Sequence, residues 1–452
     1  MSRKIVVIGG VAAGMSAASR ARRNDPDASI IVFQKENAVS YGSCGLPYYI
    51  ADDIKEAETL IAISADEFRQ KRNIEVRLNH EGISFNPREK TVEIRDLGTG
   101  MIHDYPYDKL IIATGARAAL PPIPGKELKN VFVVRNLTDG QNIKSHIEND
   151  RPATAVVVGG GYIGLEMAEA LSRQGLRVSV VEAQERVMLN IDPELSEKIE
   201  SEMEEKGCKV YTSNGVQAIL GSDRVNSVRL MNGDEIAADM VILSVGVKPN
   251  VEFAITGGVR TGKTGAIEVN QKMETNVQSV YAAGDCAEVK NLVTNKMDYI
   301  PLGTTANKQG RVAGDNASGR FARFSGVAGT AVVKIFDLEV ARTGITTTQA
   351  LNLKMNPRSV MITGKSRAGY YPGKEDITLK LIFRGDNGRL LGAHMMGKEG
   401  VAKRIDVFAT ALQQKMTVME ISELDLSYAP PYAPVWDPIL IAANQAAKSF
   451  EK

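Results

Sequence analysis

The sequence predicts an α/β fold of two doubly wound domains, followed by a third domain of the α+β class. The first observation is a pattern of strand, glycine turn, helix and strand that starts near Gly9 and returns at Gly159. The second is a change after Phe324, where the alternating pattern gives way to strand-like segments and a hairpin turn. The length of 452 residues agrees, because about 150 residues per domain suggests three domains.

The first copy of the pattern has the form of a dinucleotide-binding unit. The β-branched run Lys4–Ile8 leads into the glycine-rich turn Gly9–Gly14, an alanine-rich helix to about Arg23 and a second strand, Ser29–Phe33. In such a βαβ unit the glycines allow a tight turn and close backbone approach, and a pyrophosphate lies on the positive helix end. We therefore predict cofactor contacts from Gly9, Gly10, Ala12, Ala13 and Gly14.

The second copy is complete in its glycines and makes coincidence an unlikely explanation. The run Ala155–Val158 precedes Gly159–Gly164, a helical stretch through Leu171 and the strand Arg177–Val181. Two Rossmann-like domains are therefore predicted. The predicted contacts in this copy are Gly159, Gly161, Tyr162, Ile163, Gly164, Glu182 and Gly246.

The position that usually holds an acidic residue for a ribose hydroxyl differs between the two copies. In the second copy it is Glu182, which would bond a 2′-hydroxyl and repel a 2′-phosphate, so NADH is favoured. Arg186 nearby leaves NADPH open as an alternative. In the first copy the position holds Gln34, followed by Lys35 and Glu36, and either Gln34 or Glu36 could serve a ribose.

Two further strand-like segments end in small residues and fit the first domain. Lys109–Gly115 and Val280–Asp285 read at least as strands followed by turns. In the functional interpretation, Asp285 accepts hydrogen bonds from a flavin hydroxyl, and a helix that starts at Gly303 directs its dipole at a reduced flavin ring. The predicted contacts are Thr114, Gly115, Gly284, Asp285, Gly303, Thr304 and Ala306.

The C-terminal part of the chain predicts an α+β domain. Val332–Phe336 and Thr378–Phe383 read as strands, and Val401–Leu412 reads as an amphipathic helix. The segment Tyr428–Trp436 gathers aromatic residues and prolines around the only tryptophan. Such a segment belongs to packing or to an interface more often than to chemistry.

Composition and charge exclude several classes of protein. The 55 Lys and Arg residues nearly balance 54 Asp and Glu residues, so no general field attracts nucleic acid or an anionic membrane. No apolar run approaches the ~20 residues of a membrane span. Three cysteines without CxxC spacing argue against a disulfide scaffold, and the histidines show no metal-like spacing. We expect a cytoplasmic protein without a metal site.

Cys44 is the residue most suited to carry chemistry. It lies in a glycine-rich segment just after the first βαβ unit, where a flavin ring would reach. Pro47 suits the first turn of a helix, which would place Cys44 near a positive helix end and lower the thiol pKa. The alternative is a small buried hydrophobic residue, the commoner fate of a free cysteine, and we assign that role to Cys208 and Cys286.

Together, the two glycine motifs, ATG near residue 114, YAAGD near residue 284 and SYGSCGLPYYI resemble the pyridine nucleotide–disulfide oxidoreductase family over nearly the whole chain. The resemblance implies an FAD domain, an inserted NADH domain and a C-terminal dimerisation domain. Positions five before and five after Cys44 are Val39 and Tyr49, so the two-cysteine plan of the family is excluded. The single-cysteine branch remains: NADH oxidases and peroxidases, coenzyme A-disulfide reductases and NADH-dependent persulfide or polysulfide reductases.

Two features within that branch favour the coenzyme A-disulfide and persulfide reductases. Ala12 stands where the oxidases and peroxidases carry a histidine, and the YAPPY segment is similar to that of the coenzyme A-disulfide reductases. By this resemblance Tyr428, with Tyr370 as its companion, reaches the active site of the partner subunit in a homodimer and protonates a leaving thiolate. Packing at the interface is the alternative for both tyrosines. The residues that by resemblance hold coenzyme A are Arg20, Arg23, Ser40, Ser43, Arg72 and Tyr432, with Ser43 also near the flavin.

The resemblance also implies domain boundaries and two competing functions. We expect the FAD domain in residues 1–115 and 276–324, a linker or FAD-domain strand region in 116–150, the NAD(P)H domain in 151–275 and the dimerisation domain in 325–452. In the favoured hypothesis, electrons pass from NADH through FAD to a mixed disulfide or persulfide on Cys44, after Tyr162 moves aside for the nicotinamide. The alternatives are an NADH oxidase that reduces oxygen and an electron-carrier flavoprotein that serves a protein partner.

Overall fold

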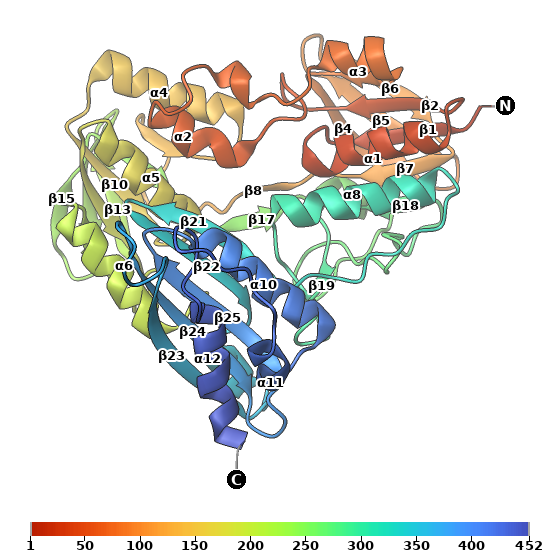
Figure 1. Cartoon of the computed structure of the whole chain (residues 1–452). Helices are drawn as coiled ribbons and strands as arrows, with labels where there is room; N and C mark the ends of the chain where they lie inside the picture. The colour runs from red at the N-terminus through yellow and green to blue at the C-terminus, as the bar shows by residue number, and fades with distance from the viewer. Residues whose placement is uncertain (1, 451–452) are drawn as a thin grey trace.

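The computed structural model describes residues 2–450 and groups them around three five-stranded sheets (Figure 1). Two of these sheets are parallel and come from the two glycine-motif regions, and the third is antiparallel and lies in the C-terminal part. The predicted fold class is therefore confirmed.

The first sheet has the strand order β18-β7-β1-β2-β3 and is parallel throughout. Helices α1 and α8 lie side by side along it (Figure 1). The two helices can approach closely because Gly310 and Gly314 have no side chain. A Cβ on Gly310 would lie 2.2 Å from the carbonyl oxygen of Ala13, and one on Gly314 would lie 2.3 Å from that of Ala17. The elements are β1 (Lys4–Ile8), β2 (Ser29–Phe33), β3 (Glu75–Arg77), β7 (Lys109–Ile112), β18 (Val280–Ala282), α1 (Ala12–Asn24) and α8 (Gly303–Ala317).

The second sheet has the order β12-β11-β10-β16-β9 and is also parallel. The chain enters it after β7 and returns to the first sheet only at β18, so the second unit is inserted into the first. The segment 116–150 is not only a linker or part of the first domain, because its strand β9 pairs with β16 of the second sheet and not with a strand of the first sheet. The elements are β9 (Val131–Val133), β10 (Thr154–Val158), β11 (Arg177–Val181), β12 (Lys209–Tyr211), β16 (Met240–Leu243), α4 (Leu137–Asp150), α5 (Tyr162–Arg173) and α6 (Pro193–Glu205).

The third sheet has the order β21-β22-β25-β24-β23, with every neighbour antiparallel. Strand β25 is buried along its whole length, because α10 and α12 cover one face of the sheet and the second unit packs against the other, where the N–H of Asp192 donates to Nδ1 of His394 (Figure 1). The elements are β21 (Ala331–Ile335), β22 (Leu338–Gly344), β23 (Pro357–Lys365), β24 (Asp376–Arg384), β25 (Leu390–Gly397), α9 (Thr347–Asn352), α10 (Val401–Gln414), α11 (Val418–Ser422) and α12 (Pro438–Ala447).

Short elements connect the three sheets. Among the helices of residues 2–450, none is long and apolar enough to cross a bilayer. The remaining helices are α2 (Leu46–Ile50), α3 (Ala65–Arg72) and α7 (Glu252–Thr256), with 3-10 turns at Ser43–Gly45, Ala57–Leu60 and Lys448–Phe450. The remaining strands are β4 (His80–Asn86), β5 (Thr91–Asp96), β6 (Ile102–Pro106), β8 (Ala116–Ala118), β13 (Val216–Gly221), β14 (Val225–Leu230), β15 (Glu235–Ala237), β17 (Val247–Pro249), β19 (Val289–Lys290) and β20 (Met297–Asp298).

Candidate functional site

The residues predicted to bind the first cofactor meet at the carboxyl edge of the first sheet. The glycine turn follows β1, and Thr114, Gly115, Gly284 and Asp285 follow β7 and β18. Gln34 and Lys35 follow β2, and Gly303, Thr304 and Ala306 form the first turns of α8. Since ligands of open parallel sheets bind at the carboxyl ends of the strands, the fold brings this set together at one edge.

The residues predicted for the second cofactor meet in the same way at the second sheet. The turn Gly159–Gly161 follows β10, Glu182 follows β11 and Gly246 lies after β16. Tyr162, Ile163 and Gly164 form the first turn of α5.

The helix ends at both edges are free to bind anions. Helices α1, α5 and α8 each begin without a side-chain cap and without an acidic residue in the first turn. By contrast, α3 and α4 begin with complete capping boxes, in which side chains occupy the first N–H groups. Uncapped N–H groups at a helix start bind phosphate, so the residues present fit the pyrophosphates of two dinucleotides.

The ribose positions of the two motifs are built alike. The side-chain Oε1 of Gln34 accepts a hydrogen bond of 2.7 Å from the backbone N–H of Gly10. Oε2 of Glu182 accepts one of 2.7 Å from the N–H of Gly160, and its Oε1 accepts one of 2.9 Å from Gln184. Both side chains are thus fixed against the glycine turn by the same bond.

The loop that carries Cys44 is anchored to the first glycine turn. The N–H of Ser40 donates to the carbonyl of Gly10 (2.9 Å), and Ser40 itself has a positive φ of 52°. Cys44 is exposed and lies in the 3-10 turn Ser43–Gly45, directly before α2, whose first turn contains Pro47 as predicted. The fold therefore places the free thiol beside the edge where the first cofactor is expected.

The electrostatics around Cys44 differ from the expectation of a lowered pKa. The surrounding protein raises the pKa of the Cys44 thiol by desolvation, and the carboxyls of Glu166 and Asp285 add to that rise, while Arg135 opposes it. Arg135 is a residue that sequence reasoning missed. Its guanidinium forms a 2.7 Å ion pair with Asp285, the predicted flavin contact. Burial and the two carboxyls therefore oppose the lowered pKa that the sequence predicts.

Glu166 and Tyr48 form a second pair that sequence reasoning missed. Tyr48, on α2, donates a 3.1 Å hydrogen bond to Oε1 of Glu166, on α5. Burial raises the pKa of Glu166 to about 7, although the bond from Tyr48 acts in the opposite direction. A group with this pKa can hold or release a proton near neutral pH, next to the predicted thiol.

The other two cysteines are buried, as predicted. The thiol of Cys286 contacts the carbonyls of Ile112 and Ala283, and Cys208 lies in the core of the second unit. Within the described residues, no group of three or more His, Cys, Asp or Glu side chains could hold a metal ion.

Only part of the predicted coenzyme A set lies together. Arg23 and Arg72 line a groove of about 460 Å³ between the C-terminal ends of α1 and α3, with Lys71 and Ser19. The Nη1 of Arg72 donates to the hydroxyl of Ser19 (3.2 Å). Arg20 does not line this groove, because it forms a 2.6 Å ion pair with Asp315 of α8. Ser40 and Ser43 lie in the Cys44 loop instead.

The three predicted tyrosines lie on the surface of the C-terminal domain. Tyr370, Tyr428 and Tyr432 are 74%, 46% and 79% exposed. The hydroxyls of Tyr370 and Tyr428 are 3.0 Å apart. Val435 and Trp436 add further exposed apolar surface to the same segment.

Comparison with known proteins assigns this arrangement to a family. Residues 3–310 match the family described as pyridine nucleotide-disulphide oxidoreductase, and residues 330–438 match its dimerisation domain. The chain belongs to this family. It is an oxidoreductase that uses FAD and NAD(P)H, and its C-terminal domain is the homodimerisation domain of the family.

Individual members of the family are similar over almost the full length. A protein of Pyrococcus abyssi named NAD(P)H sulfur oxidoreductase (CoA-dependent) is 40% identical and covers 98% of both chains. A protein of Methanocaldococcus jannaschii named NADH oxidase is 38% identical and covers 99% of both. The structure of an NAD-dependent persulfide reductase from A. fulgidus has a TM-score of 0.96 at 41% identity and covers 99% of this chain and 83% of that one.

For this oxidoreductase, replacing Glu166 by glutamine should lower the pH at which Cys44 becomes reactive. Below about pH 7 the Glu166 carboxyl is protonated, and above it the carboxylate raises the pKa of the thiol. The neutral amide of Glu166→Gln removes that charge, so the midpoint of iodoacetamide alkylation should move to lower pH. Mass spectrometry of the Cys44 peptide measures the profile. Glu75→Gln, an exposed change in β3, should leave it unmoved, and identical profiles for both variants would contradict the prediction.

Proposed function

We propose that this protein reduces coenzyme A disulfide, or a coenzyme A persulfide or polysulfide, with NAD(P)H through the single thiol of Cys44. The observation that carries the proposal is the exposed Cys44 loop tied to the first glycine turn, while the other two cysteines are buried. The relative from Pyrococcus abyssi and the persulfide reductase from A. fulgidus, by their names, support a sulfur substrate.

Coenzyme A fits the chain because one helix connects the thiol region with a basic groove. Helix α1 starts at the glycine turn beside Cys44 and carries Ser19 and Arg23 of the groove near its other end. Eleven residues at a rise of 1.5 Å separate Ala12 from Arg23 by about 16 Å. A long ligand with a thiol at one end and phosphates at the other can span this distance, with its phosphates on Arg23, Lys71 and Arg72.

The chain's own residues support a position for each cofactor. FAD would lie on Gly9–Gly14, Thr114, Asp285 and the start of α8, and NADH would lie on Gly159–Gly164 and Glu182. When bound, FAD supplies the relay that passes two electrons from the nicotinamide to sulfur. We assign β9 to the second unit and the residues from α7 onward to the first, because β9 joins the second sheet and Phe253, Ala254 and Ile267 belong to the core of the first sheet. The boundaries near 115 and 324 are kept.

Cys44 carries the sulfur chemistry in the proposed cycle. Its thiolate attacks one sulfur of coenzyme A disulfide, which forms a mixed disulfide and releases one coenzyme A thiolate. Two electrons from NADH then break the mixed disulfide and release the second coenzyme A thiolate and the Cys44 thiolate. One NADH and one proton are consumed per disulfide, and two thiols and NAD⁺ are produced.

The test is to supply each acceptor separately to the FAD-loaded protein. NADH oxidation should be fast with coenzyme A disulfide or with polysulfide plus coenzyme A, and two thiols should appear per disulfide. The name of the Methanocaldococcus jannaschii relative makes oxygen the second candidate acceptor. Oxygen consumption that accounts for the NADH oxidised, with peroxide or water as the product and no thiol produced, would replace the reductase proposal with an oxidase. The cytoplasm, where thiols stay reduced, suits the three unpaired cysteines.

The basic groove makes a separate prediction for the coenzyme A substrate. Changing Arg23 and Arg72 together to glutamine should raise KM for coenzyme A disulfide about 10-fold or more, since two charge-assisted contacts to phosphate are lost. The KM for NADH and the turnover with a small uncharged disulfide should stay unchanged. Arg20→Gln is the matched control, because this arginine binds Asp315 outside the groove. An equal effect of Arg20→Gln would remove the groove from the proposal.

The tyrosine pair is proposed to act across the dimer. The exposed Tyr428, bonded to Tyr370, can protonate the thiolate that leaves the partner's Cys44. Tyr428→Phe should lower kcat for coenzyme A disulfide about 10²-fold, the scale of a lost general acid, and leave the dimer intact. Steady-state kinetics and light scattering check the two parts. An unchanged kcat at every pH would show that the two tyrosines serve only for packing at the interface.

A further inference from the structure

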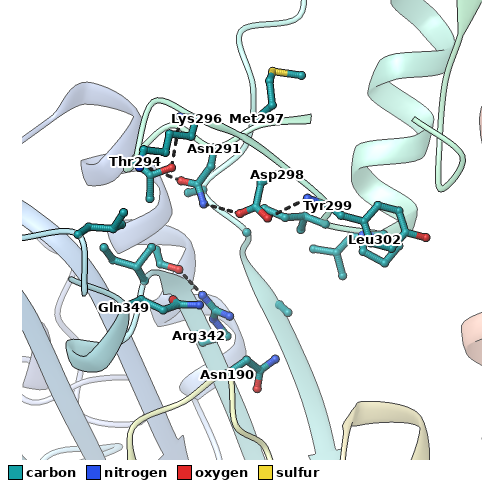
Figure 2. A pocket seen from close by; sticks show the side chains of 18 of the residues that line it. Asn190, Asn291, Thr294, Lys296, Met297, Asp298, Tyr299, Leu302, Arg342 and Gln349 are labelled. Atoms are coloured by element: carbon teal, nitrogen blue, oxygen red, sulfur yellow. Dashed lines mark hydrogen bonds between the residues drawn. The ribbon is translucent and has the colours of Figure 1, made fainter. Parts of the chain in front are cut away.

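A cavity of about 590 Å³ lies where all three units of the molecule meet (Figure 2). Tyr162 and Asn190 line it from the second unit, and the β19–β20 segment through Leu302 lines it from the first. Arg342 and Gln349 line it from the C-terminal domain. The volume is within the range of small-molecule sites in proteins.

Three polar groups at one end of this cavity are buried and have no partner in the part of the chain that the structure describes. They are Nε of Arg342, the hydroxyl of Tyr162 and Oδ1 of Asn190. Figure 2 shows Arg342 and Asn190 at the lower end, close to each other. A buried donor without a partner costs free energy, so groups of this kind are expected to bond water or a ligand.

Arg342 also forms no close ion pair with any residue that the structure describes. Its Nη2 donates to the carbonyl of Gly344, but among residues 2–450 no carboxylate lies within 4.0 Å of its guanidinium. Burial is the largest influence on the pKa of Arg342 and lowers it, while the more distant carboxylates of Asp298 and Asp192 act in the opposite direction. A buried guanidinium of this kind is a strong site for a carboxylate or another oxyanion.

The one carboxylate that lines the cavity is directed elsewhere. Oδ2 of Asp298 accepts from Nδ2 of Asn291 (3.1 Å), and its Oδ1 accepts from the N–H of Tyr299 (2.8 Å). Figure 2 shows this group in the upper part of the cavity, away from Arg342. Lys296 lines the same upper part, so the positive charge of Arg342 is not cancelled by the cavity as a whole.

The cavity adjoins the expected cofactor sites, but most of its wall comes from other residues. Of all residues predicted to hold FAD or NADH, only Tyr162 lines it, and neither glycine turn nor Glu182 does. Most of the remaining wall is apolar, with Ile345, Leu353 and Met297 among its side chains. An apolar wall with one cationic end suits an apolar molecule that carries a single oxyanion.

We propose that this cavity is a second ligand site, in which Nε of Arg342 and the hydroxyl of Tyr162 donate to the carboxylate or similar oxyanion of a small apolar molecule. The site is separate from Cys44 and from the proposed coenzyme A groove, so it does not depend on the proposed substrate. Tyr162 lines this cavity and also lies next to the expected nicotinamide position, so a ligand in the cavity contacts the Tyr162 side chain.

The test uses benzoate as the probe and the FAD-loaded protein without nucleotide. Isothermal titration should show saturable binding near one benzoate per chain, with the neutral isostere benzamide at least tenfold weaker. No saturable benzoate binding, or equal affinity for benzamide, overturns the proposal without any variant. Arg342→Gln should weaken benzoate at least tenfold, and Arg358→Gln, an exposed change in β23 of the same domain, should have no effect.

A competition separates this site from the nucleotide site. NAD⁺ fills the positions of Gly159–Gly164 and Glu182 with its ADP-ribose half and also carries the nicotinamide that is expected beside Tyr162. Saturable benzoate binding should persist in the NAD⁺-loaded protein. Displacement of benzoate by NAD⁺ but not by ADP-ribose would show that the cavity is the nicotinamide position and would overturn the proposal.

Discussion

Replacing Cys44 by serine should lower NADH-driven turnover of coenzyme A disulfide and of polysulfide by more than ~10³-fold, because no other thiol can form the covalent intermediate. The other two cysteines cannot take over this role, since Cys208 and Cys286 are only 1% and 0% exposed. Reduction of bound FAD by NADH should stay near the unmodified rate, because Cys44 is not among the residues that hold the nucleotide. Stopped-flow absorbance of the flavin and a thiol assay measure the two steps separately.

The control for Cys44 is another cysteine of the same chain. Cys208→Ser changes a buried sulfur of the second unit and should leave turnover with both acceptors intact. Oxygen is the informative acceptor for Cys44→Ser, since a flavin without a reducible partner can react with it. Full disulfide turnover in Cys44→Ser would contradict the assignment, and turnover only of oxygen in both proteins would favour the oxidase.

The sequence predicted those parts of the site that depend on the backbone. The positions of Gln34 and Glu182 follow from the length of a βαβ unit, and both side chains bond the glycine turn in the same way. Strands β2 and β11 match their predicted bounds because β-branched residues recur between turn signals. The Cys44 loop also lies beside the first glycine turn, as its position directly after β2 predicts.

The groups that tune the site could not be predicted, because they come from elsewhere in the fold. Arg135 pairs with Asp285 across 150 residues of chain, and Tyr48 meets Glu166 across 118. The pKa of Glu166 depends on its burial between α2 and α5, and no local pattern reports that burial. Arg20 failed to join the groove for the same reason, since Asp315 of α8 holds its side chain.

Asp192→Ala should destabilise the protein by about 3–5 kcal/mol, the cost of removing one partner of a buried ion pair. Asp192 is fully buried and precedes α6 of the second unit. Its carboxylate binds Nζ of Lys380 (2.8 Å) and accepts from the N–H of Thr347 (2.9 Å), both in the C-terminal domain. The alanine would leave the Thr347 N–H without an acceptor and Lys380, 5% exposed, with Glu194 as its one remaining anion.

The neighbouring His394 does not replace the lost charge. Burial and the nearby Arg342 lower the pKa of His394 to about 3, so its ring is neutral, and its Nδ1 accepts from the N–H of Asp192. Burial would raise the pKa of Asp192, but the charge that His394 carries when protonated, together with the bonds from Lys380 and Thr347, acts in the opposite direction and holds it below the ordinary value. The stabilisation is therefore present above about pH 4 and is lost as the pH falls through the lowered native pKa.

The measurement is thermal and urea unfolding of Asp192→Ala beside Asp223→Ala, followed from about pH 3 to pH 8. Asp223 also binds a lysine, at 3.0 Å from Lys129, but both side chains are about 70% exposed. Such a surface pair contributes about 0–1 kcal/mol, so Asp223→Ala should be nearly neutral at every pH. The difference between Asp192→Ala and the unmodified protein should shrink towards acid pH. Equal free energies of unfolding for the two variants at neutral pH would contradict the prediction. The contact between α6 and the C-terminal sheet would then be stabilised by packing, with no net contribution from the buried charges.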